Sequence, residues 1–354
     1  MIYAGACYQS YFRDAVRDDD LLQLQSKQNA LKYLREAVER SDGEVTDEML
    51  MTIALLAIHG SVRQHHPRFT TPLYRDNEFY SSLRFDQTHL HALRSLVRQK
   101  GGLAELKLHG LSNIISMIDT FQSLMNLSKP ELESLYSVES LVEQLQETWD
   151  NVARTRFAIQ KDGFDFLDGY EGGSQLRQVI CRIRILLETY ALSLRKPRQV
   201  PDLMVAVHTR RSLQHAVLKL EPGEDCLHES ARLATIIFLA ELGWTLPVVG
   251  GFQARATKLL LDALNKCTHD QHWETHPEFL CWATVMGGLA ARQTVRVQDF
   301  AAILRHGPVP WTKDSWIQVK ALSLKFLPFE HELTGPCHTF WDNACDLHAT
   351  EGMD

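Results

Sequence analysis

Apolar residues recur at three- and four-residue steps along most of the chain, which is the spacing of one face of an α-helix. Residues 229–244 are apolar on nearly every side, which predicts a helix enclosed by other helices. No segment shows the strict alternation of a half-buried strand, and no Asn-Gly or Asp-Gly turn joins two β-branched runs. The pattern therefore predicts an all-α, multi-helix bundle. The stripe that should be buried in a helix over residues 174–194 consists of Leu176, Val179, Ile180, Ile183, Leu187 and Tyr190.

Capping residues place the ends of several helices. Asp86 or Thr88 should begin a helix that stops at Gly101 and Gly102. Ser128 and Glu131 have the spacing of a capping box, which predicts one long helix from about residue 130 to residue 160. Further helices are predicted over residues 20–40, 46–64, 110–126, 202–220, 253–267, 277–291 and 312–327.

The loose stretch over residues 161–173 is rich in glycine and acids but is too short to be a clear linker. We therefore expect residues 1–354 to form a single helical domain with two packed halves that divide near residues 161–173. With 45% hydrophobic and 23% charged residues, the chain can bury a large core.

The charge balance weighs against a protein that binds nucleic acid directly. Asp and Glu number 44 and Lys and Arg 37, which gives a formal net charge of -7. Proteins that bind DNA phosphates usually carry a basic balance or a basic stripe. The densest basic region comprises Arg177, Arg182, Arg184, Arg195, Lys196 and Arg198. Arg177 and Arg184 are one heptad apart, which we interpret as a solvated helix face.

Two short basic stretches, residues 195–198 and 208–211, need separate consideration. The first has the composition of a weak nuclear-import signal. A basic helix end and an exposed helix face are the simpler interpretations of the two stretches.

The cysteines do not form a secreted disulfide framework, because their number is odd and their spacing is wide. We expect reduced thiols in an intracellular protein. The first residues have neither the basic nor the long apolar region of a signal peptide, and no apolar run is long enough to span a bilayer. The seven cysteines are Cys7, Cys181, Cys226, Cys267, Cys281, Cys337 and Cys345.

One segment gathers ligands that zinc prefers. Its spacing matches no known zinc pattern, because the acid between His272 and His276 is Glu274 and does not directly follow the first histidine. Pro277 also disfavours helical backbone at His276. We expect a polar loop between two helices, no metal site and no stoichiometric zinc. The residues concerned are Cys267, His269, His272, His276 and Cys281.

No local motif predicts catalysis. The chain lacks G-x-S-x-G, a G-x-G-x-x-G after a strand, and the G-x-x-x-x-G-K-[ST] phosphate loop. The glycine pairs at 101–102, 172–173, 250–251 and 287–288 are interpreted as helix stops, turns or close helix packing. We therefore predict no catalytic, cofactor-binding or metal-binding residues, no cofactor and no enzyme. Residues from distant positions remain an alternative source of a dispersed site.

Five segments share an order of helices, glycine pairs and aromatic residues that resembles one family. Together they resemble the regulatory domain of fungal zinc binuclear cluster transcription factors, the fungal-specific transcription factor domain. The segments cover most of the chain, and each one alone has little specificity. They are NALKYLREAVER with TDEMLMTIALLAIHG (29–40 and 46–60), HLHALRSLVRQKGGLAELKLHGLSNIISMIDT (89–120), ESARLATIIFLAELGW (229–244), HPEFLCWATVMGGLAARQ (276–293) and SWIQVKALSLKFLPFEHELTGPCHTFWDNA (315–344).

The resemblance implies a transcription regulator in the nucleus, acting on metabolic or secondary-metabolite genes. It implies protein partners, either transcription machinery or zinc-cluster factors, with dimerisation and a small-molecule effector as further options. The six closely spaced cysteines with which that family reads DNA are missing from this sequence. We therefore expect no sequence-specific DNA binding by this chain alone, and no membrane association.

The missing cluster leaves two origins open, a stand-alone regulatory domain or the loss of an upstream exon from the gene. Two other functions also stay open. One is a stand-alone dimerisation or small-molecule-binding module that titrates full-length factors. The other is a helical enzyme with a dispersed site.

Overall fold

The computed structural model describes residues 17–58, 85–196, 203–242, 251–292, 294–310, 312–329 and 333–351. Over these residues the chain forms α-helices joined by turns and short 3-10 helices, with no β-strand. The all-α, multi-helix fold expected from the hydrophobic pattern is confirmed.

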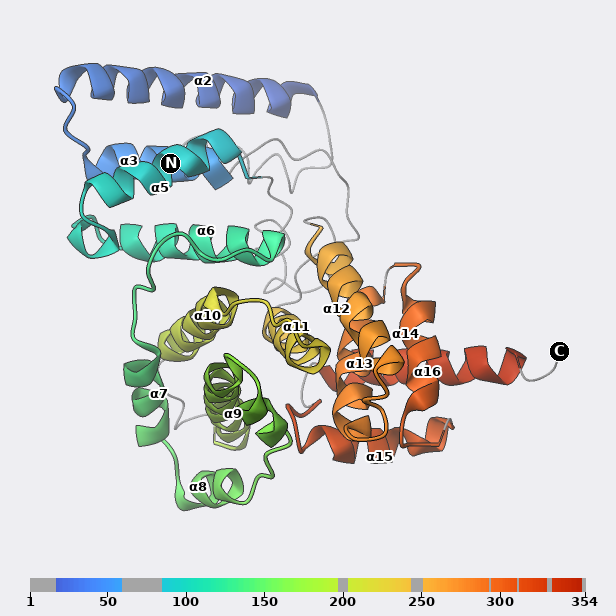
Figure 1. Cartoon of the computed structure of the whole chain (residues 1–354). Coiled ribbons are helices and arrows are strands. Elements are labelled where there is room, and N and C mark those ends of the chain that lie inside the picture. The colour runs from blue at the N-terminus through green and yellow to red at the C-terminus, as the bar shows by residue number, and fades with distance from the viewer. Residues whose placement is uncertain are drawn as a thin grey trace. The chain divides into compact units, whose positions relative to one another are not determined.

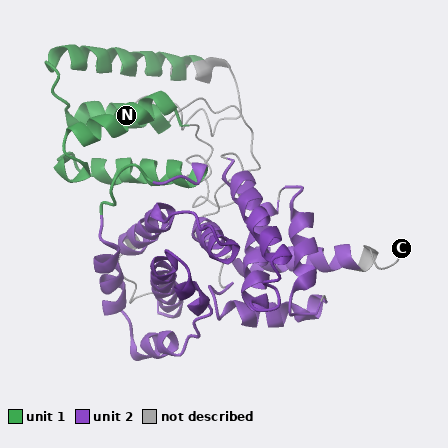
Figure 2. Ribbon diagram, in the orientation of Figure 1, with its two compact units in different colours: residues 1–125, 130–135 green, residues 126–129, 136–354 purple. Residues whose placement is uncertain are grey.

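Two compact units make up the chain (Figure 2). Unit 1 comprises residues 1–125 and 130–135, and unit 2 comprises residues 126–129 and 136–354. The division therefore falls at residues 126–135. It differs from the expected division near residues 161–173, which lie inside unit 2.

Unit 1 is a stack of helices around a small apolar core. In Figure 1, α3 (Asp47–Ile58) and α5 (Gln87–Gln99) lie between α2 (Arg17–Arg40) and α6 (Leu111–Asn126). The Asp86 carboxylate accepts hydrogen bonds from the backbone N–H groups of Thr88 and His89 at 3.1 and 3.2 Å, which confirms Asp86 as the cap of α5. Positive φ angles at Gly101 and Gly102 then turn the chain into a 3-10 helix, η1 (Leu103–Glu105).

The single helix expected over residues 130–160 is replaced by two shorter ones, α7 (Val138–Glu147) and α8 (Asn151–Ala158). Glu131 does not close a capping box, because its carboxylate binds Arg94 and Arg98, each at 2.7 Å. Ser137 caps α7 instead, and Asp150 caps α8 by accepting the Ala153 N–H at 2.8 Å. Polar residues that cap two helices therefore interrupt an apolar pattern that continues across the break.

In unit 2, α9 (Gly173–Arg195) packs against α7, α8, α10 (Leu203–Lys219) and the 3-10 helix η2 (Asp165–Gly169). The predicted helix over residues 174–194 is confirmed, and every member of its predicted stripe is buried except Tyr190, which is half-buried. Trp149, in the turn between α7 and α8, donates its indole N–H to the Thr189 hydroxyl of α9 at 2.9 Å.

The second half of unit 2 is built around α13 (Pro277–Ala291). This helix packs against α11 (Cys226–Glu241), α12 (Phe252–His269), α14 (Val297–Ile303), α15 (Trp316–Ser323) and α16 (Thr334–Glu351). Two short 3-10 helices, η5 (Leu304–His306) and η6 (Lys313–Ser315), lie between α14 and α15 along the chain. Almost every residue of α11 is buried, as expected for a helix that is apolar on all sides.

Other predicted helices match α2, α6, α10, α12 and α13 to within a few residues. The helix predicted over residues 46–64 is seen as α3 up to Ile58, and residues 59–84 lie outside the described residues. Within residues 312–327, only η6 and α15 are helical.

Candidate functional site

The segment that holds two cysteines and three histidines does not assemble as one cluster. Cys267 is buried near the end of α12, whereas His269 points to solvent. His276 precedes α13, and Cys281 is buried within that helix, where burial raises the pKa of its thiol to about 12. The Sγ atom of Cys281 faces Gly307 instead of the histidines.

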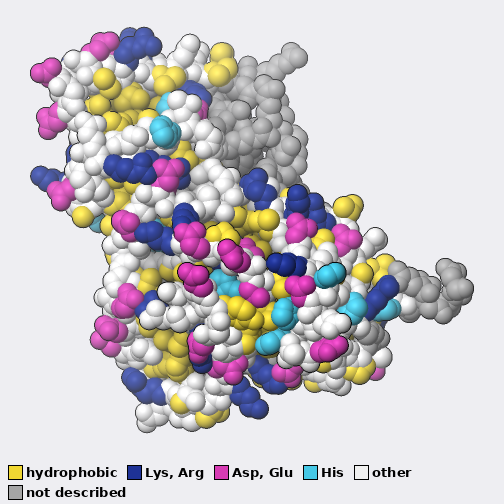
Figure 3. Space-filling model, in the orientation of Figure 1, with side chains coloured by type: hydrophobic (Ala, Val, Ile, Leu, Met, Phe, Trp, Pro, Cys, Tyr) yellow, Lys and Arg dark blue, Asp and Glu magenta, His cyan; other side chains and the backbone are white. Residues whose placement is uncertain are grey.

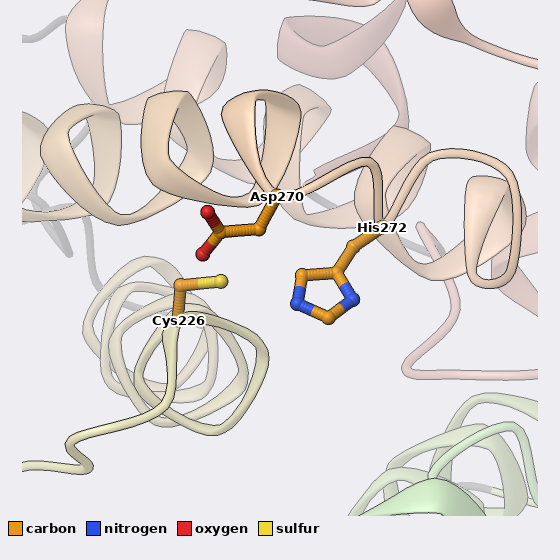
Figure 4. A group of neighbouring side chains, drawn as sticks. All are labelled: Cys226, Asp270 and His272. Carbon is orange, nitrogen blue, oxygen red and sulfur yellow. The ribbon is translucent and has the colours of Figure 1, made fainter.

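A different set of side chains converges at the same end of α12. The Cys226 thiol, one Asp270 carboxylate oxygen and one His272 ring nitrogen all lie within 4.8 Å of one another. Figure 4 shows Cys226 on the first turn of α11, facing Asp270 and His272 in the turn after α12. Cys226 is buried, Asp270 is exposed and His272 is half-buried, so the group reaches the surface through Asp270 and His272.

Local backbone geometry places these three residues. Asp225 caps α11 through the backbone N–H groups of Leu227 and His228 at 2.8 and 3.3 Å, which fixes Cys226 at the helix start. Between Asp270 and His272, Gln271 has a φ of 60°, a left-handed conformation that is uncommon outside glycine. The His272 N–H then bonds the Cys267 carbonyl at 3.0 Å, which folds the turn back toward α11.

A second cysteine supports the first. Cys267 is fully buried, and its thiol is near enough to that of Cys226 for each to affect the pKa of the other. The Ser230 hydroxyl lies 3.8 Å from the Cys267 Sγ atom. Burial raises the pKa of both thiols, so both are protonated at neutral pH. None of the described cysteines is in a disulfide.

Two more histidines and an aromatic group border the cluster. The imidazole of His228 is packed against Gly223, and neither of its nitrogens makes a hydrogen bond of normal geometry. Burial lowers the pKa of His228 and outweighs the opposing effect of the Glu229 carboxylate. The rings of His272 and His276 are 6.4 Å apart, and Phe166 lies 5.0 Å from His276.

Acidic groups dominate the charge around the cluster. Burial and the neighbouring His272 lower the pKa of His276, whereas Asp165 and Asp225 raise it. Asp225 also contributes to the raised pKa of Tyr170, whose first cause is burial. Figure 3 shows histidines gathered among acidic side chains on the face of unit 2 that is in view. The arrangement can hold a cation or donate hydrogen bonds to a polar ligand.

The basic residues of α9 do not form a phosphate-binding stripe. Arg184 was expected on a solvated face, but it is only 7% exposed. Its guanidinium donates to the carbonyls of Lys325 and Phe326 at 2.8 and 3.2 Å and to Asp162 at 3.2 Å. Its position one heptad from Arg177 does not indicate this, because the two carbonyl acceptors lie 141 and 142 residues away along the chain.

Each of the other described basic residues in this region binds an acid of unit 2. The pairs are Arg177 with Asp162 and Asp168, Arg182 with Glu139, Arg195 with Glu188, and Lys196 with Asp150. Arg198 lies outside the described residues. Figure 3 likewise shows basic and acidic side chains interspersed on the visible face.

The second basic stretch is also engaged within the chain. Arg210 is 8% exposed and donates to the Leu242 carbonyl at 2.9 Å, contrary to the exposed helix face that we expected. Burial lowers the pKa of Arg211. Neither stretch therefore presents a row of free cations along its described part.

Among the described residues, no helix combines the length and the apolar character needed to cross a bilayer. No model of a known protein family matches the chain, and no curated protein or solved structure matches it significantly.

Proposed function

We propose that this chain is a regulatory module of transcription in the nucleus, which acts through protein partners and reaches DNA only through another protein. The resemblance to the fungal-specific transcription factor domain is the starting point of the proposal. The contacts of the described residues that carry the resemblance support it, because these residues hold helices together.

In unit 1, the segment over residues 89–120 joins α5 to α6 through a buried ion pair. Asp119 accepts from the Arg94 guanidinium at 2.7 Å and from the Leu132 N–H at 2.9 Å. Arg94 also binds Glu131 at 2.7 Å. The acid that ends this segment is therefore a structural residue.

In unit 2, the E-x-x-R pattern of α11 forms an internal ion pair, Glu229 with Arg232, at 2.6 and 2.7 Å. The Trp282 indole N–H in α13 donates to the Leu327 carbonyl at 2.9 Å, which ties the segment over residues 276–293 to the segment over residues 315–344. These side chains stabilise the fold, and we propose no reaction for them.

The observation that carries the proposal is an exposed apolar stripe on α2. Leu24, Leu31 and Val38 are spaced by seven residues, so they lie on one side of the helix. Their exposed fractions are 61%, 39% and 50%, and Leu21 beside them is also exposed. A different face of α2, with Ala30 and Leu34, packs on the core of unit 1.

An exposed apolar stripe of this kind is typical of a protein interaction site, because its free energy falls when a partner removes the apolar side chains from water. Its seven-residue spacing suits a partner helix packed along α2. We propose that α2 is the surface through which the module engages its protein partners.

Reporter output from a tethered chain tests the proposal. The whole chain is fused to an unrelated DNA-binding domain and expressed beside the unfused chain. We expect the fusion to change reporter output and the unfused chain to leave it at background. The combined variant Leu24→Gln, Leu31→Gln and Val38→Gln should return the fusion toward the DNA-binding domain alone.

A matched variant controls for the integrity of α2. Gln25→Ala, Lys32→Ala and Glu39→Ala alter the exposed positions that each follow one stripe residue, and should keep the wild-type output. A wild-type fusion without effect, or a stripe variant with full effect, would contradict the proposal.

The stripe also favours the second candidate function, a stand-alone dimerisation module. In that case the purified chain self-associates through α2, and light scattering gives twice the mass of one chain. The stripe variant would then be a monomer, while the control variant would stay dimeric.

A further inference from the structure

We propose that Cys226, Asp270 and His272 bind one divalent cation of the zinc class and leave one coordination position for an outside ligand. The site lies in unit 2, and its argument does not depend on the proposed role in transcription. It departs from the expectation of no metal, which considered only the spacing within residues 267–281.

The geometry of the three ligand atoms suits a small tetrahedral ion. They lie within 4.8 Å of one another. With metal–sulfur bonds of about 2.3 Å and metal–nitrogen bonds of about 2.0 Å, tetrahedral ligands are roughly 3.3–3.8 Å apart. The separations of at most 4.8 Å therefore need to shorten by no more than about 1.5 Å for all three atoms to bind one ion.

The kinds of ligand favour zinc over magnesium or calcium. A thiol and an imidazole are poor ligands for these hard cations, which bind oxygen almost exclusively. One sulfur, one nitrogen and one oxygen suit Zn²⁺, or Co²⁺ in its place. Three protein ligands with a free fourth position are typical of zinc sites that bind an exchangeable water or ligand.

The backbone holds the ligands in place. Cys226 is fixed by the Asp225 cap, and the turn with Asp270 and His272 is held by a series of backbone hydrogen bonds. One of them runs from the His276 N–H to the His272 carbonyl at 2.8 Å, and another from the Asp270 N–H to the Lys266 carbonyl at 2.9 Å. Gln271 keeps a left-handed φ between two of the ligands, which is a local cost in this turn.

The electrostatic environment attracts a cation. The carboxylates of Asp165 and Asp225 lie near enough to His276 to favour its protonated form, and Asp270 supplies a further carboxylate. Lys266 is the basic group that acts on Cys226, and its ammonium group points to the Glu224 carbonyl at 3.4 Å. The acids outnumber the base around the cluster.

Cys267 supports Cys226 and is not a ligand. Its thiol lies next to that of Cys226, in the buried layer between α11 and α12. Its Sγ atom lies 3.8 Å from the Ser230 hydroxyl oxygen. Binding of the cation displaces the Cys226 proton, so one thiolate–metal bond forms and one proton enters solution for each ion bound.

Titration of the purified chain with Co²⁺ tests the site. The chain carries no polyhistidine tag and is kept reduced with a phosphine. We expect saturation at one ion per chain, a thiolate-to-cobalt charge-transfer band, the intense visible bands of tetrahedral cobalt, and release of about one proton. Zn²⁺ should displace the cobalt and abolish the bands.

Variants assign the ligands. Cys226→Ser should remove the charge-transfer band. Asp270→Asn and His272→Ala should each weaken binding by more than the roughly 10–100-fold that loss of an outer-sphere partner costs. Cys267→Ser should keep the band, and Cys181→Ser and His91→Ala serve as thiol and imidazole controls on exposed positions.

Circular dichroism of each variant checks that the helices are retained. The proposal is overturned if cobalt fails to saturate one site below millimolar concentration. It is also overturned if the charge-transfer band persists in Cys226→Ser, or if it follows Cys267 instead.

Discussion

Gly288 of α13 is in direct contact with the ring of Phe340 of α16. A Cβ atom built on Gly288 would lie 2.1 Å from the Cζ atom of that ring. A Cβ atom built on the neighbouring Gly287 would likewise lie 2.1 Å from the Cε1 atom of Phe300 of α14. The glycine pair thus lets two aromatic rings reach the backbone of the central helix of unit 2.

Gly288→Ala should destabilise unit 2, because the added methyl group must displace Phe340. Overpacking of this kind costs about 1–3 kcal/mol. Denaturant unfolding followed by circular dichroism measures the loss. Gly335→Ala is the matched control, since nothing lies within 4 Å of a Cβ atom at that helical position. An unchanged midpoint for Gly288→Ala would show that α16 does not pack on α13 as described.

Asp119→Ala should destabilise unit 1. Asp119 is 2% exposed, and its loss leaves Arg94 without the partner on α6. Removing one member of a buried pair costs about 3–5 kcal/mol, and Glu131 should offset part of that here. Glu39→Ala, at an exposed position on α2, should have little effect. Equal stability of the two variants in denaturant unfolding would exclude the role of Asp119.

Asp162 should make unit 2 sensitive to acid. Burial raises the pKa of this carboxyl, but the Phe164 N–H and the guanidinium groups of Arg177 and Arg184 outweigh burial and hold the pKa below its usual value of 3.8. A group with a lowered folded pKa stabilises the fold above its unfolded pKa. That contribution is lost as the pH falls from 3.8 through the lower folded value.

Thermal unfolding of Asp162→Asn against wild type checks this dependence. The variant should unfold at lower temperature near neutral pH, and the difference should shrink as the pH falls below 3.8. Glu143→Gln, on an exposed part of α7, is the control and should give no such convergence. A difference that stays constant with pH would assign the effect of Asp162 to packing alone.

The hydrophobic pattern predicts most helices, because one face of nearly every segment is buried against a neighbour. The pattern fails where a polar residue binds a distant partner or caps a new helix. Glu131 binds Arg94 and Arg98 instead of capping its own segment, and Asp150 begins a new helix inside an unbroken apolar run. Local spacing contains no information about such partners.

The candidate site shows the same limit more strongly. His272 belongs to a segment that the ligand types single out, but Cys226 is 46 residues away along the chain. Only the packing of α11 on α12 brings the two together. The apolar pattern predicts a helix over residues 229–244, yet nothing near Cys226 indicates that it begins this helix or which turn it faces. The sequence could not predict the burial of Arg184 for the same reason, because the two carbonyls that it binds belong to a distant segment.

DNA binding by the purified chain tests most directly the claim that this module reaches DNA only through another protein. The chain is incubated with random duplexes at physiological salt, and bound duplexes are separated by mobility shift and sequenced over several rounds. The net charge of -7 and the internal pairing of the basic residues of α9 predict that no sequence is enriched. Enrichment of one sequence, bound with an affinity that falls steeply as salt is raised, would contradict the claim.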